Sequence, residues 1–270
     1  MSDLIRVTHG VWRPSDCLDD LPGLVSAALA ACPAGTVVSG LTAARLHGLW
    51  LPDRPDEPVE VIVHRDEPVP ARRPGSRRRE IRARRRVLRS DEIVTIDGIA
   101  VTSEPRTWVD LAERLSTPDL VAAGDAALRG SATPADLEHA VRRAAGRRGI
   151  RRARAALPIL DGRSRSRPES HLRYTIVAGG LPVPAVNEPI YSADGEWLAE
   201  PDLSYDDVRL ALEYNGADHA AVDRMRRDIT RELDVTARGG WRTVTFGPVQ
   251  VFRRPDQVVA IVRQLRRERR

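Results

Sequence analysis

Residues 201–216 read PDLSYDDVRLALEYNG, and they decide the fold of the C-terminal part of the chain. On either side of the acidic turn Asp206-Asp207, segments 197–204 and 209–215 have the apolar content and turn boundaries of strands. Asp202 and Glu213 interrupt these segments and stand eleven residues apart. We predict that adjacent antiparallel strands bring both carboxylates onto one face of a sheet, close enough to share a divalent cation.

Two strand carboxylates near a helix carboxylate, here Glu169, suit metal-assisted hydrolysis of a phosphodiester. Mg²⁺, or Mn²⁺ in its place, polarises a phosphoryl oxygen and activates a bound water. An acid in an apolar strand is costly unless it is paired or metal-bound. The alternative is therefore an edge strand whose acids pair with arginines, for which the candidates are Arg173, Arg227 and Arg231.

The last hundred residues have the pattern of an α/β domain of order αβββαβα. Glycine and aspartate turns separate its elements. We expect a helix over 168–178, strands over 185–191, 197–204 and 209–215, a helix over 221–237, a strand over 241–246 and a helix over 256–267.

Residues 1–116 predict a mixed region of helices and a small sheet, and residues 117–164 a helical connector that ends in an arginine-rich linker before the domain at 165–270. Asp97-Gly98 between two apolar segments predicts a type I′ hairpin. The class is α/β, or α+β for the whole chain. Further elements expected in the first region are strands over 4–13, 59–63 and 81–88, and helices over 22–31, over 36–49 and after Ser103.

The charge of the chain is unevenly distributed. Its 270 residues contain 43 basic and 38 acidic side chains, and every basic one is arginine. The absence of lysine excludes Schiff-base chemistry and phosphate-loop lysines. Segments 72–89 and 142–167 hold ten arginines each, whereas the remainder has 23 arginines against 36 acids.

Local arginine density favours a surface that faces a polyanion, because guanidinium groups bind phosphate in a bidentate manner. DNA is the expected partner. The alternative is that these runs are solvated loops and helix faces. The arginines selected as nucleic-acid-binding candidates are Arg77, Arg78, Arg147, Arg148, Arg151 and Arg152.

The sequence predicts a cytoplasmic protein without a membrane partner. No apolar run approaches the length of a membrane span, and residues 1–6 lack the apolar stretch of a signal peptide. Cys17 and Cys32 have neither zinc-site spacing nor a nearby histidine cluster, so two reduced thiols are expected.

The C-terminal residues carry a resemblance. Residues 147–270 resemble an uncharacterised actinobacterial family of endonuclease-like proteins related to very-short-patch-repair nucleases, within the restriction-endonuclease-like PD-(D/E)XK superfamily. The segments that carry it are PDLSY (201–205), LEYNGADH (212–219), DITREL (228–233) and GWR (240–242), with GIRRAR (149–154) and RPESHLR (167–173) upstream.

This resemblance implies that Asp202 and Glu213 are metal ligands and that Glu169 is the helix acid. Asp228 and Arg231 match a helix pair that orients the site. Where the superfamily motif has lysine, this chain has Asn215, which carries no charge and exchanges no proton at neutral pH. Either His219 acts as acid or base, as in the short-patch-repair branch, or the site is inactive. A surface histidine beside Asp218 is the alternative for His219.

The N-terminal residues resemble AbiEi antitoxins of abortive-infection toxin–antitoxin systems. The matching segments are VTHGVWR (7–13), SGLTAARLHGL (39–49) and GIAVTSEPRTWVDL (98–111). Relatives begin with a winged helix-turn-helix whose wing ends in a strand like 4–13. Its recognition helices are missing before that strand here, so we expect a late start codon or loss of this major-groove reader.

Three hypotheses follow. The first is a metal-dependent DNA endonuclease, linked to phage defence or DNA repair. The second is a catalytically inactive, antitoxin-like DNA-binding transcriptional regulator of a type IV toxin–antitoxin system, with a cognate toxin or self-association as its protein contact. The third is a partner-binding protein without nucleic acid.

Overall fold

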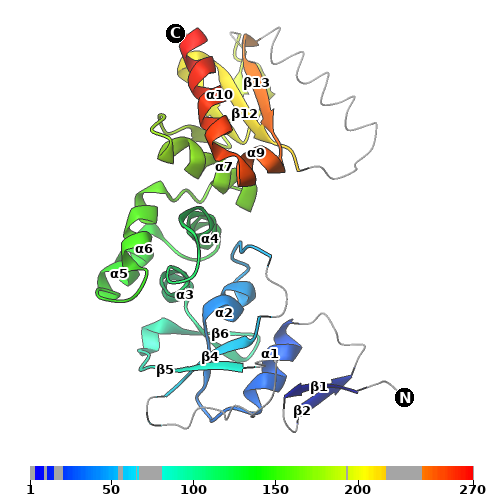
Figure 1. Cartoon of the computed structure of the whole chain (residues 1–270), viewed down its shortest axis with the longest axis vertical. Coiled ribbons are helices and arrows are strands. Elements are labelled where there is room, and N and C mark those ends of the chain that lie inside the picture. The colour runs from blue at the N-terminus through cyan, green and yellow to red at the C-terminus, as the bar shows by residue number, and fades with distance from the viewer. Residues whose placement is uncertain are drawn as a thin grey trace. The chain divides into compact units, whose positions relative to one another are not determined.

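The structure, a computed structural model, describes residues 4–8, 11–14, 21–53, 57–64, 66, 81–192, 194–216 and 239–269. The chain forms two compact units: Met1–Leu115 with Gly130–Arg154, and Ser116–Arg129 with Ala155–Arg270. Helices and strands are mixed along the chain (Figure 1), which confirms the predicted α/β class. The predicted division into three domains stays a prediction.

The first unit is built around a five-stranded sheet of order β5-β4-β3-β7-β6. Strands β4/β5 and β3/β7 pair in parallel, and β3/β4 and β6/β7 are antiparallel. Its elements are β1 (Leu4–Thr8), β2 (Val11–Pro14), α1 (Leu21–Leu29), β3 (Val37–Val38), α2 (Gly40–Leu46), β4 (Val59–Val63), β5 (Ile81–Arg85), β6 (Ile93–Ile96), β7 (Ile99–Thr102), α3 (Glu104–Leu111), α5 (Pro134–Arg143) and most of α6 (Ile150–Ala156).

The core of this unit lies between α1, α2 and the sheet. Val59, Val61 and Val63 of β4 pack with Val25 of α1 and Val101 of β7. The hairpin between β6 and β7 is confirmed: Asp97 has φ 48° and Gly98 has φ 79°, the positive values that a type I′ turn requires at both central residues.

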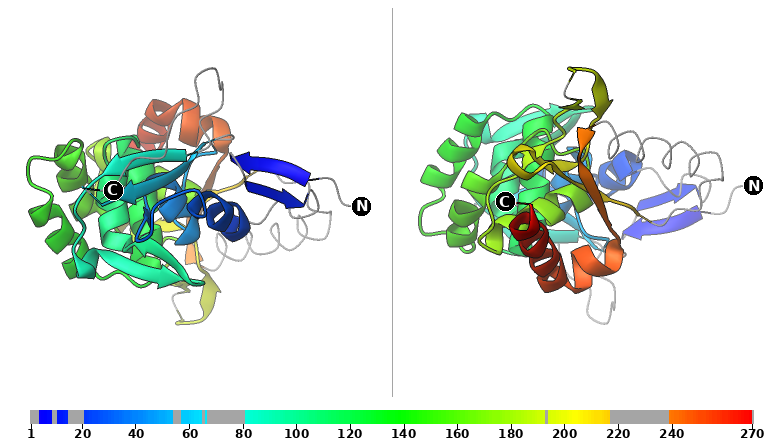
Figure 2. Two further views of the ribbon diagram at one scale, coloured as in Figure 1. Left: turned by 90° about the horizontal axis from the view of Figure 1, so that it is seen from below. Right: turned by 90° about the horizontal axis from the view of Figure 1, so that it is seen from above.

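Two predictions for this unit were wrong. Segment 4–13 is two strands, since β1 and β2 form an antiparallel hairpin that Figure 2 shows apart from the main sheet. Segment 36–49 is not one helix, because the β-branched pair Val37-Val38 forms β3 and α2 begins only at Gly40.

The second unit carries a four-stranded sheet of order β13-β12-β11-β8 and a separate β9–β10 hairpin. The β12/β13 pair is parallel, and β11 is antiparallel to both β8 and β12. Its elements are α4 (Thr117–Arg129), α7 (Arg167–Ala178), β8 (Ala185–Val186), β9 (Ile190–Tyr191), β10 (Trp197–Ala199), β11 (Leu203–Tyr205), β12 (Leu210–Tyr214), β13 (Arg242–Phe246), α9 (Pro248–Arg253) and α10 (Pro255–Glu268).

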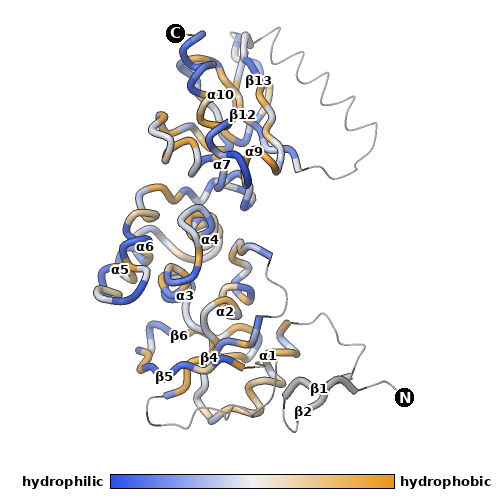
Figure 3. The backbone as a smooth tube through the Cα atoms, in the orientation of Figure 1, coloured by the Kyte–Doolittle hydropathy of each residue, from blue (hydrophilic) through white to orange (hydrophobic). Residues whose placement is uncertain are grey.

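One face of this sheet is covered by α7 and α10. Leu203 and Leu212 from the strands pack with Leu172 of α7 and with Val258 and Val262 of α10. Hydrophobic and hydrophilic residues alternate along α10 (Figure 3), as its single buried face requires. The opposite face carries Ala211, which packs with the β9–β10 hairpin.

The predicted strands 185–191 and 197–204 are each broken into two. Asn187 has φ 47°, which ends β8, and Pro201 has no N–H for a sheet ladder. Each break sends the chain from one sheet to the other. The helix predicted over 221–237 lies outside the described residues.

Within the described part of the chain, no helix is both long enough and apolar enough to span a bilayer. Cys32 is a free thiol, and burial raises its pKa. Cys17 lies outside the described residues.

Candidate functional site

The register of β11 and β12 brings the two carboxylate-bearing residues to neighbouring positions. Leu203 of β11 pairs with Leu212 of β12, so the same register, carried one residue further, places Asp202 opposite Glu213. Residues directly opposite in an antiparallel pair point to the same side of the sheet. By alternation along β12, Glu213 points to the side of Ala211, away from α7 and α10, while the Asp202 carboxylate accepts from the Tyr214 N–H. The register therefore supports the predicted juxtaposition of Asp202 and Glu213.

Asp202 lies in an environment that disfavours its charge. Burial raises the pKa of its carboxyl to about 6, and the negative charges of Glu169 and Glu213 add to the rise. The Tyr214 N–H donates to Oδ2 of Asp202 at 2.7 Å and opposes this shift by stabilising the carboxylate. A cation beside Asp202 would offset the same repulsion.

Glu169 is held by local hydrogen bonds at the start of α7. Its Oε1 accepts from the Ser166 hydroxyl at 2.8 Å, and its Oε2 accepts from the Arg165 N–H at 2.8 Å and from Asn187 Nδ2 at 3.0 Å. A carboxylate in the first turn of a helix is stabilised by the helix dipole. Glu169 thus ties the entry of α7 to the turn after β8 while its charge acts on Asp202.

Asn187 is a residue of this site that the sequence did not predict. Its Nδ2 also donates to the Arg163 carbonyl at 2.9 Å, and its backbone N–H donates to the Asp202 carbonyl at 3.1 Å. The only signal in the sequence is that asparagine tolerates positive φ better than most residues.

Two carboxylates, those of Asp202 and Glu213, are the donors expected for a magnesium ion here. No cluster of three or more histidine, cysteine or acidic side chains suited to a metal occurs among the described residues. Mg²⁺ in proteins often takes one or two carboxylates and keeps several waters. Asp202 and Glu213 are the residues that would hold it.

The other predicted residues of this site fall in different places. Asn215 follows β12, is exposed, and donates its backbone N–H to the Phe246 carbonyl at 3.0 Å, which extends the parallel ladder. His219, Asp228 and Arg231 lie outside the described residues, as do Arg77 and Arg78.

The suggestion that Arg173 neutralises the strand acids was wrong. Its guanidinium donates instead to Asp125 of α4 and to the Ile159 carbonyl. Side-chain exposure is 2% for Arg173 and 0% for Asp125. This buried ion pair joins α7 to α4 and places α4 in the second unit.

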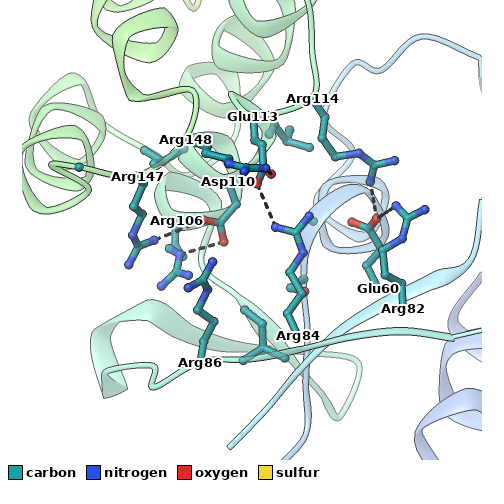
Figure 4. Close-up of a pocket in the computed structure, with 16 residues that line it drawn as sticks. Glu60, Arg82, Arg84, Arg86, Arg106, Asp110, Glu113, Arg114, Arg147 and Arg148 are labelled. Atoms are coloured by element: carbon teal, nitrogen blue, oxygen red, sulfur yellow. Dashed lines mark hydrogen bonds and ion pairs between the residues drawn. The ribbon is translucent and has the colours of Figure 1, made fainter. Parts of the chain in front are cut away.

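The predicted nucleic-acid-binding arginines of segment 142–167 differ in their surroundings. Arg152 Nη1 donates to the carbonyls of Ala112 and Leu115, both at 2.7 Å. Arg148 and Arg151 are exposed, and Arg147 donates to Asp110 Oδ1 at 3.3 Å. The first unit also holds an arginine-lined cavity of about 410 Å³ (Figure 4), which we call the arginine pocket.

Comparison with known proteins matches one part of the chain to a known domain. Residues 34–159 match the AbiEi antitoxin C-terminal domain, a segment that contains the arginine pocket as well as α4. The uncharacterized proteins MT2308 and Rv2248 of two Mycobacterium tuberculosis strains are each 34% identical over 270 residues, which covers 98% of this chain and 94% of each relative. The chain belongs to the family of these mycobacterial proteins. No solved structure gave a significant match.

Proposed function

We propose that this protein is an antitoxin-type regulator that binds DNA. The match of residues 34–159 to an antitoxin domain carries the proposal. The arginine-rich segments supply its physical basis, since phosphate contacts from arginine provide most of the sequence-independent affinity for DNA. A cognate toxin, or a second copy of the chain, is the proposed protein partner.

We expect the exposed face of α6 to contribute to DNA binding. Arg151 and Arg154 are exposed and lie one helical turn apart. Replacing both by alanine should weaken binding of a mixed-sequence duplex about tenfold and lower the slope of log affinity against log salt by about two, because two phosphate contacts are lost. Fluorescence anisotropy over a salt series measures both quantities.

The matched control is Arg242→Ala with Arg253→Ala, which removes two exposed arginines outside segments 72–89 and 142–167. Its affinity should stay near that of the unchanged protein. An α6 variant with unaltered affinity and salt slope would remove this helix from the DNA surface. Absence of DNA binding by the unchanged protein would refute the regulator proposal.

A second candidate function is metal-dependent hydrolysis of DNA. The opposed carboxylates Asp202 and Glu213, with the raised pKa of Asp202, support it. Their order after the acid-bearing helix α7 also agrees with the resemblance to PD-(D/E)XK nucleases. A bound Mg²⁺ would supply the Lewis acid and the activated water. With Asn215 in the lysine position, His219 is the proposed proton-transfer residue.

Asp202→Asn tests the metal site through stability. In a chelating buffer near neutral pH we expect this variant to be more stable to urea by about 2 kcal/mol, since the pKa of Asp202 is about 6 in the folded state and about 3.9 unfolded. In the unchanged protein, protonation of Asp202 stabilises the fold below pH about 4, and this stabilisation is lost as the pH rises through about 6. The advantage of the variant should therefore vanish in acid.

Mn²⁺ should raise the melting temperature of the unchanged protein and not that of Asp202→Asn, because the metal binds only the ionised carboxylate. Cleavage of supercoiled DNA, if the site is active, should disappear in the same variant. An equal response of both proteins to Mn²⁺ would contradict the proposed ligand. Metal binding without cleavage would leave the regulator function and refute the nuclease.

A further inference from the structure

The arginine pocket lies against strand β5 in the first unit. Side chains alternate along a strand, so Arg82, Arg84 and Arg86 share one side of β5 and its continuation, whereas Arg85 points to the other. All three line the cavity. Further arginines reach it from α3, from the residues after α3, and from the turn at Gly146–Gly149 (Figure 4).

The lining has an excess of positive charge. Seven arginines and three acids among the described residues line the cavity, and Glu57 and Glu92 also form ion pairs with lining arginines, which leaves an excess of two positive charges. Glu60 accepts from Arg82 at 2.7 Å and from Arg114, and Glu113 accepts from Arg84 at 3.0 Å. One side of the arginine pocket is therefore largely neutralised.

The other side carries the excess. Arg86, Arg106 and Arg147 gather around Asp110 (Figure 4). Arg106 Nε donates to Asp110 at 2.9 Å and its Nη1 lies 3.0 Å from Glu92 Oε1. Within the described part of the chain, no acid lies within ion-pair distance of Arg86. Burial lowers the pKa of Arg147, the positive charges of Arg106 and Arg86 add to this shift, and Asp110 and Glu92 oppose it.

Size and shape indicate a small ligand. A volume of about 410 Å³ is within the usual range of small-molecule sites and does not admit a duplex. No described side chain that lines the cavity is aromatic, so a nucleobase would find no stacking partner. Guanidinium groups match phosphate oxygens in pairs.

We propose that the arginine pocket binds a polyphosphate chain, as carried by a nucleoside triphosphate or by inorganic polyphosphate, through Arg86, Arg147 and Arg148. Arg84 lies beside them on the same face of β5. This site is an addition to the proposed DNA-binding function and does not depend on it. Its occupancy would place the antitoxin-family unit under the control of a small anion.

Isothermal titration calorimetry of the full chain, at low salt with a chelator, tests the proposal with ATP, inorganic triphosphate and adenosine. We expect both triphosphates to bind and adenosine not to bind. If ATP binds more strongly than inorganic triphosphate, the natural ligand is a nucleotide. If the two bind equally, the natural ligand is an inorganic polyphosphate. Failure of both triphosphates would overturn the site.

Arg86→Ala should weaken triphosphate binding at least about tenfold, whereas Arg85→Ala, the same charge change on the opposite side of the strand, should not. Circular dichroism confirms that both variants fold. Equal losses in the two variants would mean only general charge attraction and would overturn the site. Duplex DNA bound through Arg86 without competition from triphosphate would assign this arginine to the DNA surface and also overturn it.

Discussion

Replacing Arg173 by methionine is expected to lower the free energy of unfolding by about 3–5 kcal/mol near neutral pH. The guanidinium is the charge partner of Asp125, and both side chains are almost fully buried. Burial already raises the pKa of Asp125, and the positive charge of Arg173 opposes that rise. Without Arg173, the fold must either bury an unpaired carboxylate or protonate it.

The stability of Arg173→Met is expected to depend on pH. In the variant, the pKa of Asp125 is raised above its unfolded value, so protonation stabilises the fold in acid and this stabilisation is lost as the pH rises through the folded-state pKa. Urea unfolding at several pH values should show the deficit of Arg173→Met shrinking toward acid. The double variant Arg173→Met with Asp125→Asn should recover part of the loss, because no buried charge remains. A deficit below about 1 kcal/mol at neutral pH would contradict the role of the pair.

Gly149→Ala is the second substitution with a large expected effect, a loss of about 3–5 kcal/mol from the first unit. Gly149 has φ 80°, and an added Cβ would lie 2.3 Å from the carbonyl carbon and oxygen of Ala112 and 2.5 Å from the Glu113 nitrogen. Backbone atoms cannot move aside as a flexible side chain can. The turn that carries Arg147 and Arg148 would shift, so triphosphate binding should be lost as well.

Gly146→Ala is the matched control. Its φ is 82°, but an added Cβ would meet nothing within 4 Å, so only the cost of the left-handed conformation applies, about 1 kcal/mol. Hydrogen exchange of the α3 amides isolates the stability of the first unit. Equal protection in the two variants would show that the close approach to Ala112 is relieved at little cost.

The sequence predicted best where the determining interactions are local. The Asp97-Gly98 hairpin needs only two residues that tolerate positive φ. Helix α5 begins where Thr133 precedes a proline, and Asp136 completes the cap: its backbone N–H donates to Thr133 Oγ1 at 3.2 Å. Such signals are contained within a few residues.

Prediction failed where the path of the chain depends on distant partners. From the strand pattern alone, β8 and β9 were predicted as one strand, and so were β10 and β11. The hydrogen bonds that separate the members of each pair belong to two different sheets. The antiparallel pairing of β11 with β12 was predictable, since a tight turn links these strands. The arginine pocket was not, because residues that line it, such as Arg86 and Arg147, are far apart in the sequence.

The place of α4 has a consequence for inheritance. The chain passes between the two units three times, after Leu115, after Arg129 and after Arg154. No single cut, fusion point or recombination event can therefore separate the units intact, and a fragment that begins at residue 165 would bury Arg173 without Asp125. The segment that matches an antitoxin domain and the acid-bearing sheet are therefore expected to occur together in one chain, in agreement with the similarity to the mycobacterial relatives along nearly the whole chain.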